Sequence, residues 1–338
     1  MIIDAHHHAV PIRVYRKFHD PDLPPKVYYF NDTMFGFSRN LCMLEDTARI
    51  MDEAGVDMAL LSVAQFANII GKDICREIND GMAEEVARFP GRFLASASFP
   101  QGDPEAAVEE IEYAVKELKF RSVSMVTSLT PEITINSKEY TFPIYEKIQE
   151  LDVPVFFHPN ILPFGAETEC TISSSVARGM DTAKTCLRLI YDVLPAFPDI
   201  KFVLPHFGGA TLALKGRMQA FYQPPESLGL PTVKEKYKTL AKTPLESEEL
   251  GHTKAFNDMF DKLYIDGAGS GGWPPITEMA FRTVRHDHLL WGTDYPYEIH
   301  ESRDMRYYLD TLNGMDVSEE SIKAFKGGNI ARLLKIDA

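Results

Sequence analysis

The sequence has few cysteines, no excess of positive charge and no long apolar segment, and each absence narrows the class of protein. None of the cysteines forms a Cys-x-x-Cys pair, which argues against a disulfide framework and favours a reducing cytoplasm. The net charge of −14 argues against nucleic acid and anionic membranes as partners. No apolar run reaches about 18 residues, so a membrane-spanning helix is not expected. The four cysteines are Cys42, Cys75, Cys170 and Cys186.

The chain also lacks a basic-then-apolar leader, internal repeats and low-complexity tracts. Because the first candidate ligand is at residue 6, we expect the start to be mature sequence rather than a signal peptide. Apolar residues make up 45% of the 338 residues, enough for a large core. This length would allow two domains, but barrels of alternating strands and helices reach it as one domain.

Short apolar stretches alternate along the chain with stretches of helical period. Eight apolar stretches are predicted as strands: 2–8, 57–63, 93–99, 121–126, 153–159, 201–207, 262–267 and 288–293. Six intervening segments are predicted as helices: 44–54, 73–88, 104–118, 140–151, 183–196 and 275–285. This alternation predicts an α/β fold, and eight repeats favour a closed (β/α)8 TIM barrel over an open doubly wound sheet. We therefore expect residues 1–338 to form one TIM-barrel domain.

Two segments depart from this alternation. Residues 10–43 are rich in aromatic residues and are predicted as a long loop after the first strand, of the kind that carries function or a partner contact. Residues 223–252 are highly charged, and are predicted as a solvated helical insertion after the sixth strand. Surface decoration or a dimer arm is the alternative for both, and we favour it for the second.

Four residues at predicted strand ends form a candidate metal site. His6 and His8 lie two positions apart in the first strand, so their side chains share a face about 7 Å apart. In a barrel the carboxyl ends of all strands face one pocket, and His158 and Asp294 lie at the ends of two later strands. A lone histidine there is more often structural, but three imidazoles and a carboxylate together suit Zn²⁺, or alternatively Mn²⁺.

His206 ends the sixth predicted strand and reaches the same rim. It could complete the coordination of the metal, or remain apart and transfer protons. We favour proton transfer because imidazole titrates near neutral pH. Asp294 has two interpretations as well, as a direct ligand or as the base that deprotonates water.

Together these motifs resemble the amidohydrolase superfamily. Asp-x-His-x-His in the first strand, His-Pro after the fifth, His-x-Gly-Gly after the sixth and Gly-Thr-Asp-x-Pro after the eighth resemble its second large branch. That branch includes the aminocarboxymuconate semialdehyde and gamma-resorcylate decarboxylases. The resemblance extends over essentially the whole chain and implies non-oxidative decarboxylation of an unsaturated or aromatic acid, with hydrolysis or hydration in some members.

Carried over residue by residue, the resemblance implies that His6, His8, His158 and Asp294 are metal ligands and that His206 is the acid/base. Binuclear members have a bridging lysine on the fourth strand. The fourth strand here reads Ser-Val-Ser-Met-Val-Thr, so one metal is expected. A homodimer is the expectation of the family.

The resemblance also suggests a substrate-binding residue, Arg217, eleven residues after His206. This branch often has an arginine there that reaches a substrate carboxylate, sometimes in the neighbouring subunit, and the bidentate guanidinium suits that role. An ordinary surface arginine is the alternative. The aminocarboxymuconate enzyme has another carboxylate-binding arginine where Thr47 stands, which weakens the case for that substrate. Arg39 and Arg178 are candidates to replace it.

Three functions remain open from the sequence. The leading one is a metal-dependent carboxy-lyase that decarboxylates a small aromatic or unsaturated carboxylic acid. The alternative is a hydrolase or hydratase of the same branch that uses metal-activated water. The third is a barrel with a degenerate site that only binds, which the complete set of ligand positions argues against.

Overall fold

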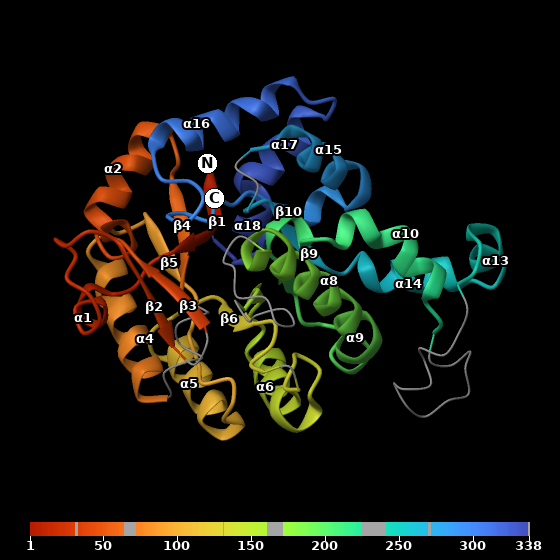
Figure 1. Cartoon of the computed structure of the whole chain (residues 1–338), viewed down its shortest axis with the longest axis horizontal. Coiled ribbons are helices and arrows are strands. Elements are labelled where there is room, and N and C mark those ends of the chain that lie inside the picture. Colours follow the sequence, from red (N-terminus) through yellow and green to blue (C-terminus); the bar gives the residue numbers. More distant parts are fainter. Residues whose placement is uncertain are drawn as a thin grey trace.

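The computed structural model describes residues 1–30, 33–63, 72–130, 132–160, 172–224, 241–269 and 272–336. Most of its strands lie in the middle of the molecule, with helices around them (Figure 1). Among the described residues, no helix is long and apolar enough to cross a membrane.

All eight predicted strands are present and pair in parallel, in two sheets ordered β1-β4-β5 and β10-β9-β8-β7-β6. Every residue of β1, β6, β7 and β8 is buried, as expected for strands covered on both faces. The strands are β1 Ile3–His8, β4 Met58–Ser62, β5 Phe93–Ala95, β6 Val123–Val126, β7 Val155–His158, β8 Phe202–Leu204, β9 Tyr264–Asp266 and β10 Leu289–Leu290. The fold is therefore α/β with parallel strands.

Backbone hydrogen bonds join the edges of the two sheets. After β5, Ala97 donates its N–H to the carbonyl of Ser122 at 2.9 Å, just before β6. On the other side, the N–H of Ala5 in β1 donates to the carbonyl of Trp291 at 2.9 Å. The N–H of His8 likewise donates to Tyr295 at 2.8 Å, so β1 is tied to the chain that leaves β10.

The predicted helices are present, with one interruption. The segment predicted as one helix over 183–196 begins earlier, as α8, and contains a π-helical turn at Leu189–Val193 before it ends as α9. Local signals fix several ends: Gly55 ends α2 with a φ of 75°, and the Asp103 carboxylate accepts the Ala106 N–H at the start of α5. The helices are α1 Ile12–Tyr15, α2 Leu44–Ala54, α4 Lys72–Ala87, α5 Pro104–Lys116, α6 Lys138–Leu151, α8 Arg178–Arg188, α9 Leu194–Ala196, α10 Thr211–Phe221, α13 Pro244–Glu249, α14 His252–Phe260, α15 Pro274–Thr283, α16 Ser302–Thr311, α17 Glu319–Lys323 and α18 Asn329–Leu333.

The segment 10–43 is not the plain loop that we expected. It contains α1 and an antiparallel pair of strands, β2 Lys26–Phe30 and β3 Thr33–Phe37, in which Tyr28 lies opposite Phe35. Alternating aromatic residues fit a pleated surface, and Phe37 is fully buried among its aromatic neighbours. This hairpin is seen as the red-orange arrows near α1 and α4 (Figure 1).

The segment 223–252 is described only in part, because 225–240 lie outside the described residues. Its described end is helical: α13 begins with a capping box in which Thr243 and Glu246 bond each other's backbone N–H groups. In Figure 1, α13 lies at the periphery of the molecule, far from β1.

Three of the four cysteines are free, buried thiols: Cys42, Cys75 and Cys186. Burial raises the pKa of the Cys75 thiol to about 12, so the reactive thiolate is scarce at neutral pH. Cys170 lies outside the described residues.

Candidate metal centre

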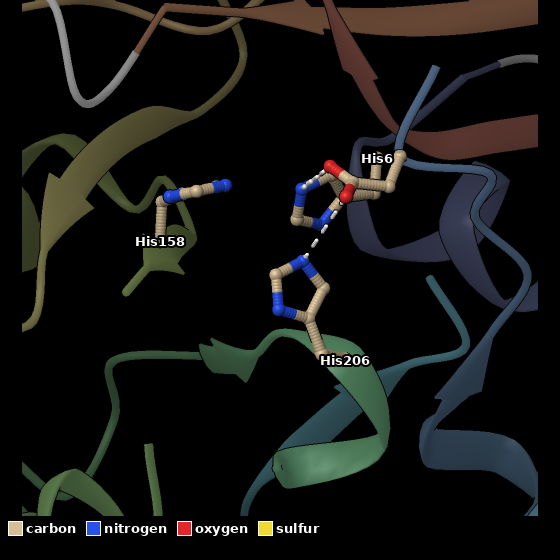
Figure 2. Close-up of side chains that lie close together, drawn as sticks. His6, His158 and His206 are labelled. Carbon is tan, nitrogen blue, oxygen red and sulfur yellow. Dashed lines mark ion pairs between the residues drawn. The ribbon is translucent and has the colours of Figure 1, made fainter. Parts of the chain in front are cut away.

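All five side chains predicted for the metal and proton-transfer roles converge at the carboxyl ends of the strands. His6 and His8 come from β1, His158 ends β7, His206 follows β8 and Asp294 follows β10. One donor atom from each of His6, His158, His206 and Asp294 lies within 4.8 Å of the others. Figure 2 shows the rings of His6 and His206 directed at one carboxylate, with His158 facing them from across the site.

Three donor atoms form a compact triangle. Nε2 of His6 and Nε2 of His8 lie 3.2 Å apart, and Oδ1 of Asp294 is 3.0 Å from His8 Nε2 and 3.5 Å from His6 Nε2. A tetrahedral ion with bonds of about 2.05 Å places its ligand atoms about 3.3 Å from one another. The spacing of these three atoms therefore fits ligands of a single cation.

Two of the histidine rings contact backbone carbonyls through Nδ1, on the side away from the cluster. Nδ1 of His158 lies 2.9 Å from the Pro159 carbonyl, and Nδ1 of His8 lies 3.3 Å from the Ser62 carbonyl. A carbonyl oxygen only accepts, so these contacts favour a hydrogen on Nδ1 in both rings. Each neutral ring then presents the lone pair of Nε2 to the site, as a metal ligand requires.

Asp266, which sequence reasoning missed, supplies the corresponding partner of His6. Its Oδ2 lies 2.8 Å from Nδ1 of His6, and its Oδ1 accepts the backbone N–H groups of His206 at 3.0 Å and Ala268 at 3.1 Å. The signal was available, because Asp266 is the last residue of β9, an acidic residue at a strand end like those that predicted the site.

The charge state of the site suits a cation. Burial acts to raise the pKa of Asp294, but the neighbouring imidazoles of His206, His6 and His8 outweigh it and hold the pKa well below the usual value. Burial, together with the neighbouring imidazoles, lowers the pKa of His158 well below its usual value. The carboxylate is therefore ionised and His158 neutral at pH 7, the forms in which both coordinate metals.

His6 is the exception. Burial acts to lower its pKa, but the carboxylates of Asp266 and Asp294 raise it well above the usual value. Two carboxylates therefore give this position a strong preference for positive charge, which either a proton or a metal ion satisfies.

His206 occupies a more open place in the cluster than the other histidines. Its side chain is 15% exposed, against 5–6% for His6 and His8, and its Nε2 lies 3.9 Å from Oδ2 of Asp294, the oxygen outside the triangle. Its backbone is left-handed, with φ of 55°, and φ stays positive through Gly209. A Cβ on Gly209 would lie 2.5 Å from the Gly179 carbonyl, so glycine is required where this turn meets α8.

Asp4 joins the two ends of the chain beneath this cluster. Its buried Oδ1 accepts the N–H groups of His6 at 3.1 Å and Thr293 at 3.0 Å. Its Oδ2 lies 2.8 Å from Nδ1 of His7 and accepts the hydroxyl of Thr293 at 2.5 Å. The backbone of His6 and the residue before Asp294 are thus held by one carboxylate.

We expect that replacing Asp4 by asparagine lowers the free energy of unfolding by about 3 kcal/mol. The amide nitrogen of asparagine is a donor, so it would leave without an acceptor some of the buried N–H and O–H groups that the Asp4 carboxylate now accepts. Urea unfolding of the metal-free protein measures this. The matched control is Asp57→Asn, which changes a half-exposed carboxylate that accepts the Ile2 N–H and should cost below about 1 kcal/mol. Equal costs for the two variants would contradict the role of Asp4.

The structure does not bring Arg217 into the cluster. Arg217 is exposed on α10, and its guanidinium lies 5.1 Å from the centre of the Phe221 ring. An exposed position is compatible with the neighbouring-subunit role that the resemblance implies, so that role stays a prediction.

The other two candidate arginines differ in their surroundings. Arg39 is exposed and forms ion pairs with two aspartates of its own region. Arg178 is partly buried at the start of α8, and the next residue, Gly179, accepts the N–H of Ala210 beside the His206 turn at 3.0 Å. Arg178 is therefore the better placed of the two.

Tyr297 is a further neighbour of the site that sequence reasoning missed. Its ring centre lies 5.4 Å from that of His8, and its hydroxyl donates to the Gly36 carbonyl in β3 at 3.3 Å. The side chain is 36% exposed. Tyr297 thus connects the aromatic hairpin to the His8 side of the cluster.

Comparisons with known proteins agree with this geometry. The amidohydrolase family model matches residues 3–336. A gamma-resorcylate decarboxylase of Polaromonas sp. is 28% identical over 318 residues, which cover 89% of this chain and 90% of that enzyme. A 2-keto-4-carboxy-3-hexenedioate hydratase of Sphingobium sp. is 26% identical over 187 residues, 51% of this chain and 53% of the hydratase.

The fold also resembles a solved structure. A dihydroxybenzoic acid decarboxylase from Polaromonas sp., with bound manganese and the inhibitor 2-nitroresorcinol, superposes with a TM-score of 0.73 at 23% identity. The match covers 100% of this chain and 97% of that one.

Proposed function

The chain belongs to the amidohydrolase family, and from that premise we propose that it is a metal-dependent decarboxylase of a small aromatic or unsaturated carboxylic acid. The observation that carries the proposal is the buried triangle of two imidazole nitrogens and a carboxylate oxygen, 3.0–3.5 Å apart. The decarboxylase relative, which matches along nearly the whole chain, supports the reaction.

We further infer that the eight strands form one closed (β/α)8 barrel. The hydrogen bonds from Ala97 to Ser122 and from Ala5 to Trp291 support this, because they join both pairs of sheet edges. A closed barrel directs every strand end to one pocket, which accounts for the convergence of residues from β1, β7, β8 and β10.

We propose His6, His8, His158 and Asp294 as the ligands of one divalent ion. When bound, such an ion supplies Lewis acidity that orients the substrate and stabilises the developing negative charge. This donor set suits Zn²⁺, our expected metal, and also Mn²⁺, which the decarboxylase of similar fold contains. The stretch from Ser122 to Thr127, which contains β6, has no lysine that could bridge a second ion.

The remaining side chains supply the proton and the binding surface. In the proposed reaction the bond between the ring or alkene carbon and the carboxylate breaks, and its electron pair stays on that carbon. His206, which lies on the Oδ2 side of Asp294, delivers a proton to that carbon, and CO₂ departs. We assign the substrate carboxylate to Arg217 of a neighbouring subunit, which requires a homodimer, with Arg178 as the alternative within the chain.

The aromatic hairpin serves to limit water at the site. The hydroxyl of Tyr297 donates a hydrogen bond to the Gly36 carbonyl in β3, and its ring lies beside that of His8. These two contacts hold β2 and β3 close to the cluster. Excluding water protects the carbon electron pair from a competing proton source and strengthens the electrostatic interactions.

A hydrolase or hydratase is the second candidate. The hydratase relative favours it, and the same donor set could activate water for attack on a carbonyl or alkene. The product distinguishes the two reactions: a decarboxylase releases CO₂ and takes one solvent hydrogen onto the carbon that lost it, whereas a hydrolase or hydratase incorporates oxygen from labelled water.

The test is a screen of hydroxybenzoates and muconate-type acids with the purified protein, in which we expect CO₂ release without uptake of labelled oxygen. Removing metal with a chelator should abolish this activity, and Zn²⁺ or Mn²⁺ should restore it. Metal at about a thousand times its Kd should also raise the free energy of unfolding by about 4 kcal/mol. Full turnover in protein shown to be metal-free by elemental analysis would contradict the proposal.

A further inference from the structure

One buried carboxylate outside the proposed ligand set contacts two of the site histidines. Asp266 is 1% exposed and ends β9. Its Oδ2 reaches the ring of His6 at 2.8 Å, and its Oδ1 accepts the backbone N–H of His206 at 3.0 Å. The same residue therefore contacts a proposed ligand and the proposed proton donor.

The contact with His6 fixes which ring nitrogen is free. An ionised carboxylate only accepts, so Nδ1 of His6 must carry the hydrogen that lies between it and Asp266. Nε2 then faces the triangle of donor atoms, 3.2 Å from Nε2 of His8. In the other tautomer, a hydrogen on Nε2 would point into the triangle and occupy the lone pair that a metal needs.

The contact with His206 supports a strained turn. His206 and Phe207 both have positive φ, at 55° and 53°, a conformation that costs non-glycine residues energy and persists only when the surroundings hold it. Asp266 holds the first N–H of this turn. The chain just after β9 also packs on the ring, because a Cβ on Gly269 would lie 2.7 Å from His206 Cγ.

We propose that Asp266 is a positioning residue that sets the tautomer of His6 and the backbone of His206 together. One carboxylate would thereby couple metal affinity to the placement of the proton donor. This inference rests on the proposed function, since it concerns the same site.

The first test is Asp266→Asn, read out as the Kd for Zn²⁺ and Mn²⁺ in competition with a chromophoric chelator. The amide oxygen can still accept from His206, but the amide nitrogen then faces His6 and drives a hydrogen onto its Nε2. We expect the Kd to rise about 10–100-fold, the usual cost of losing such a partner. A Kd within about twofold of the wild type would overturn the proposal.

The matched control is Glu110→Gln. Glu110 is also a buried carboxylate, 6% exposed, and accepts hydrogen bonds from Arg76 and Asn79 on α4, away from the metal centre. Its loss should lower stability in urea without changing the Kd for metal. If Glu110→Gln weakened metal binding as much as Asp266→Asn, the effect would be general destabilisation and the proposal would fail.

The second test leaves Asp266 in place, so it does not depend on the folding of an Asp266 variant. In His6→Gly, added 4-methylimidazole can replace the lost ring, with one nitrogen for the metal and one N–H for Asp266. The isomer 1-methylimidazole has the same size but carries a methyl group in place of that N–H. We expect 4-methylimidazole to restore metal affinity at least tenfold better, and equal restoration would overturn the proposal.

These outcomes separate the two levels of inference. A wild-type protein that binds neither Zn²⁺ nor Mn²⁺ would refute the proposed function itself. A wild type that binds metal and an Asp266→Asn variant that binds it equally well would refute only the positioning role.

Discussion

Replacing His206 by alanine is expected to lower turnover by about 10²–10⁴-fold while leaving the metal content unchanged, because a positioned general acid contributes this much. The geometry supports the separation of the two effects. Nε2 of His206 lies 3.9 Å from Oδ2 of Asp294, whereas the compact triangle involves Oδ1. The measurement is kcat for CO₂ release together with elemental analysis of the same preparation.

The control for this variant is His252→Ala, which removes another buried imidazole, from α14 outside the cluster. It should retain both metal and turnover. Loss of metal from His206→Ala would make His206 a ligand, the other interpretation that the sequence left open. Full activity of His206→Ala would exclude the proton-transfer role.

Replacing Asp294 by asparagine is expected to weaken metal binding by at least about 100-fold. Losing a residue that only orients a metal ligand costs about 10–100-fold in affinity, and losing a proposed ligand itself should cost no less. Turnover should fall by about 10³-fold or more as the charge stabilisation is lost. The change is nearly isosteric, but it removes the negative charge that His6 and His8 approach within 3.5 Å. Metal Kd and kcat/KM measure the two effects.

Asp287→Asn is a matched control at the other end of the same strand. Asp287 precedes β10, is half-exposed and pairs with Arg285. Losing such a surface ion pair should cost below about 1 kcal/mol and should not alter metal affinity. An Asp294→Asn variant that bound metal as tightly as Asp287→Asn would remove the basis of the proposed site.

Most of the strands were predictable because they are short and mainly apolar, the pattern of strands buried on both faces. The hairpin of β2 and β3 was not, since its aromatic residues were interpreted as a functional loop instead of a pleated surface. The π-helical turn at Leu189–Val193 was missed because a helical period in the sequence does not reveal how the hydrogen bonds of the helix shift.

The candidate site was predictable to the extent that strand ends determine it. His158 and Asp294 could be assigned together because parallel strands end at the same rim. Asp266 obeys the same rule, but its role depends on which ring it faces, and only the folded arrangement fixes that. The role of Arg217 could not be predicted from its position alone. It lies eleven residues after His206, on α10, but this spacing does not determine which group its guanidinium contacts.

The hydrogen bonds between β1 and the segment after β10 have a consequence for how the chain folds during translation. His8 and Asp294 are 286 residues apart, and Asp4 bonds Thr293 across a similar span. During translation, β1 leaves the ribosome with one edge unpaired and must wait for almost all of the chain before its last neighbour arrives. Such a topology folds slowly and leaves that edge open to wrong partners. A nascent chain stalled before Thr293 would therefore lack both the last neighbour of β1 and the proposed ligand Asp294.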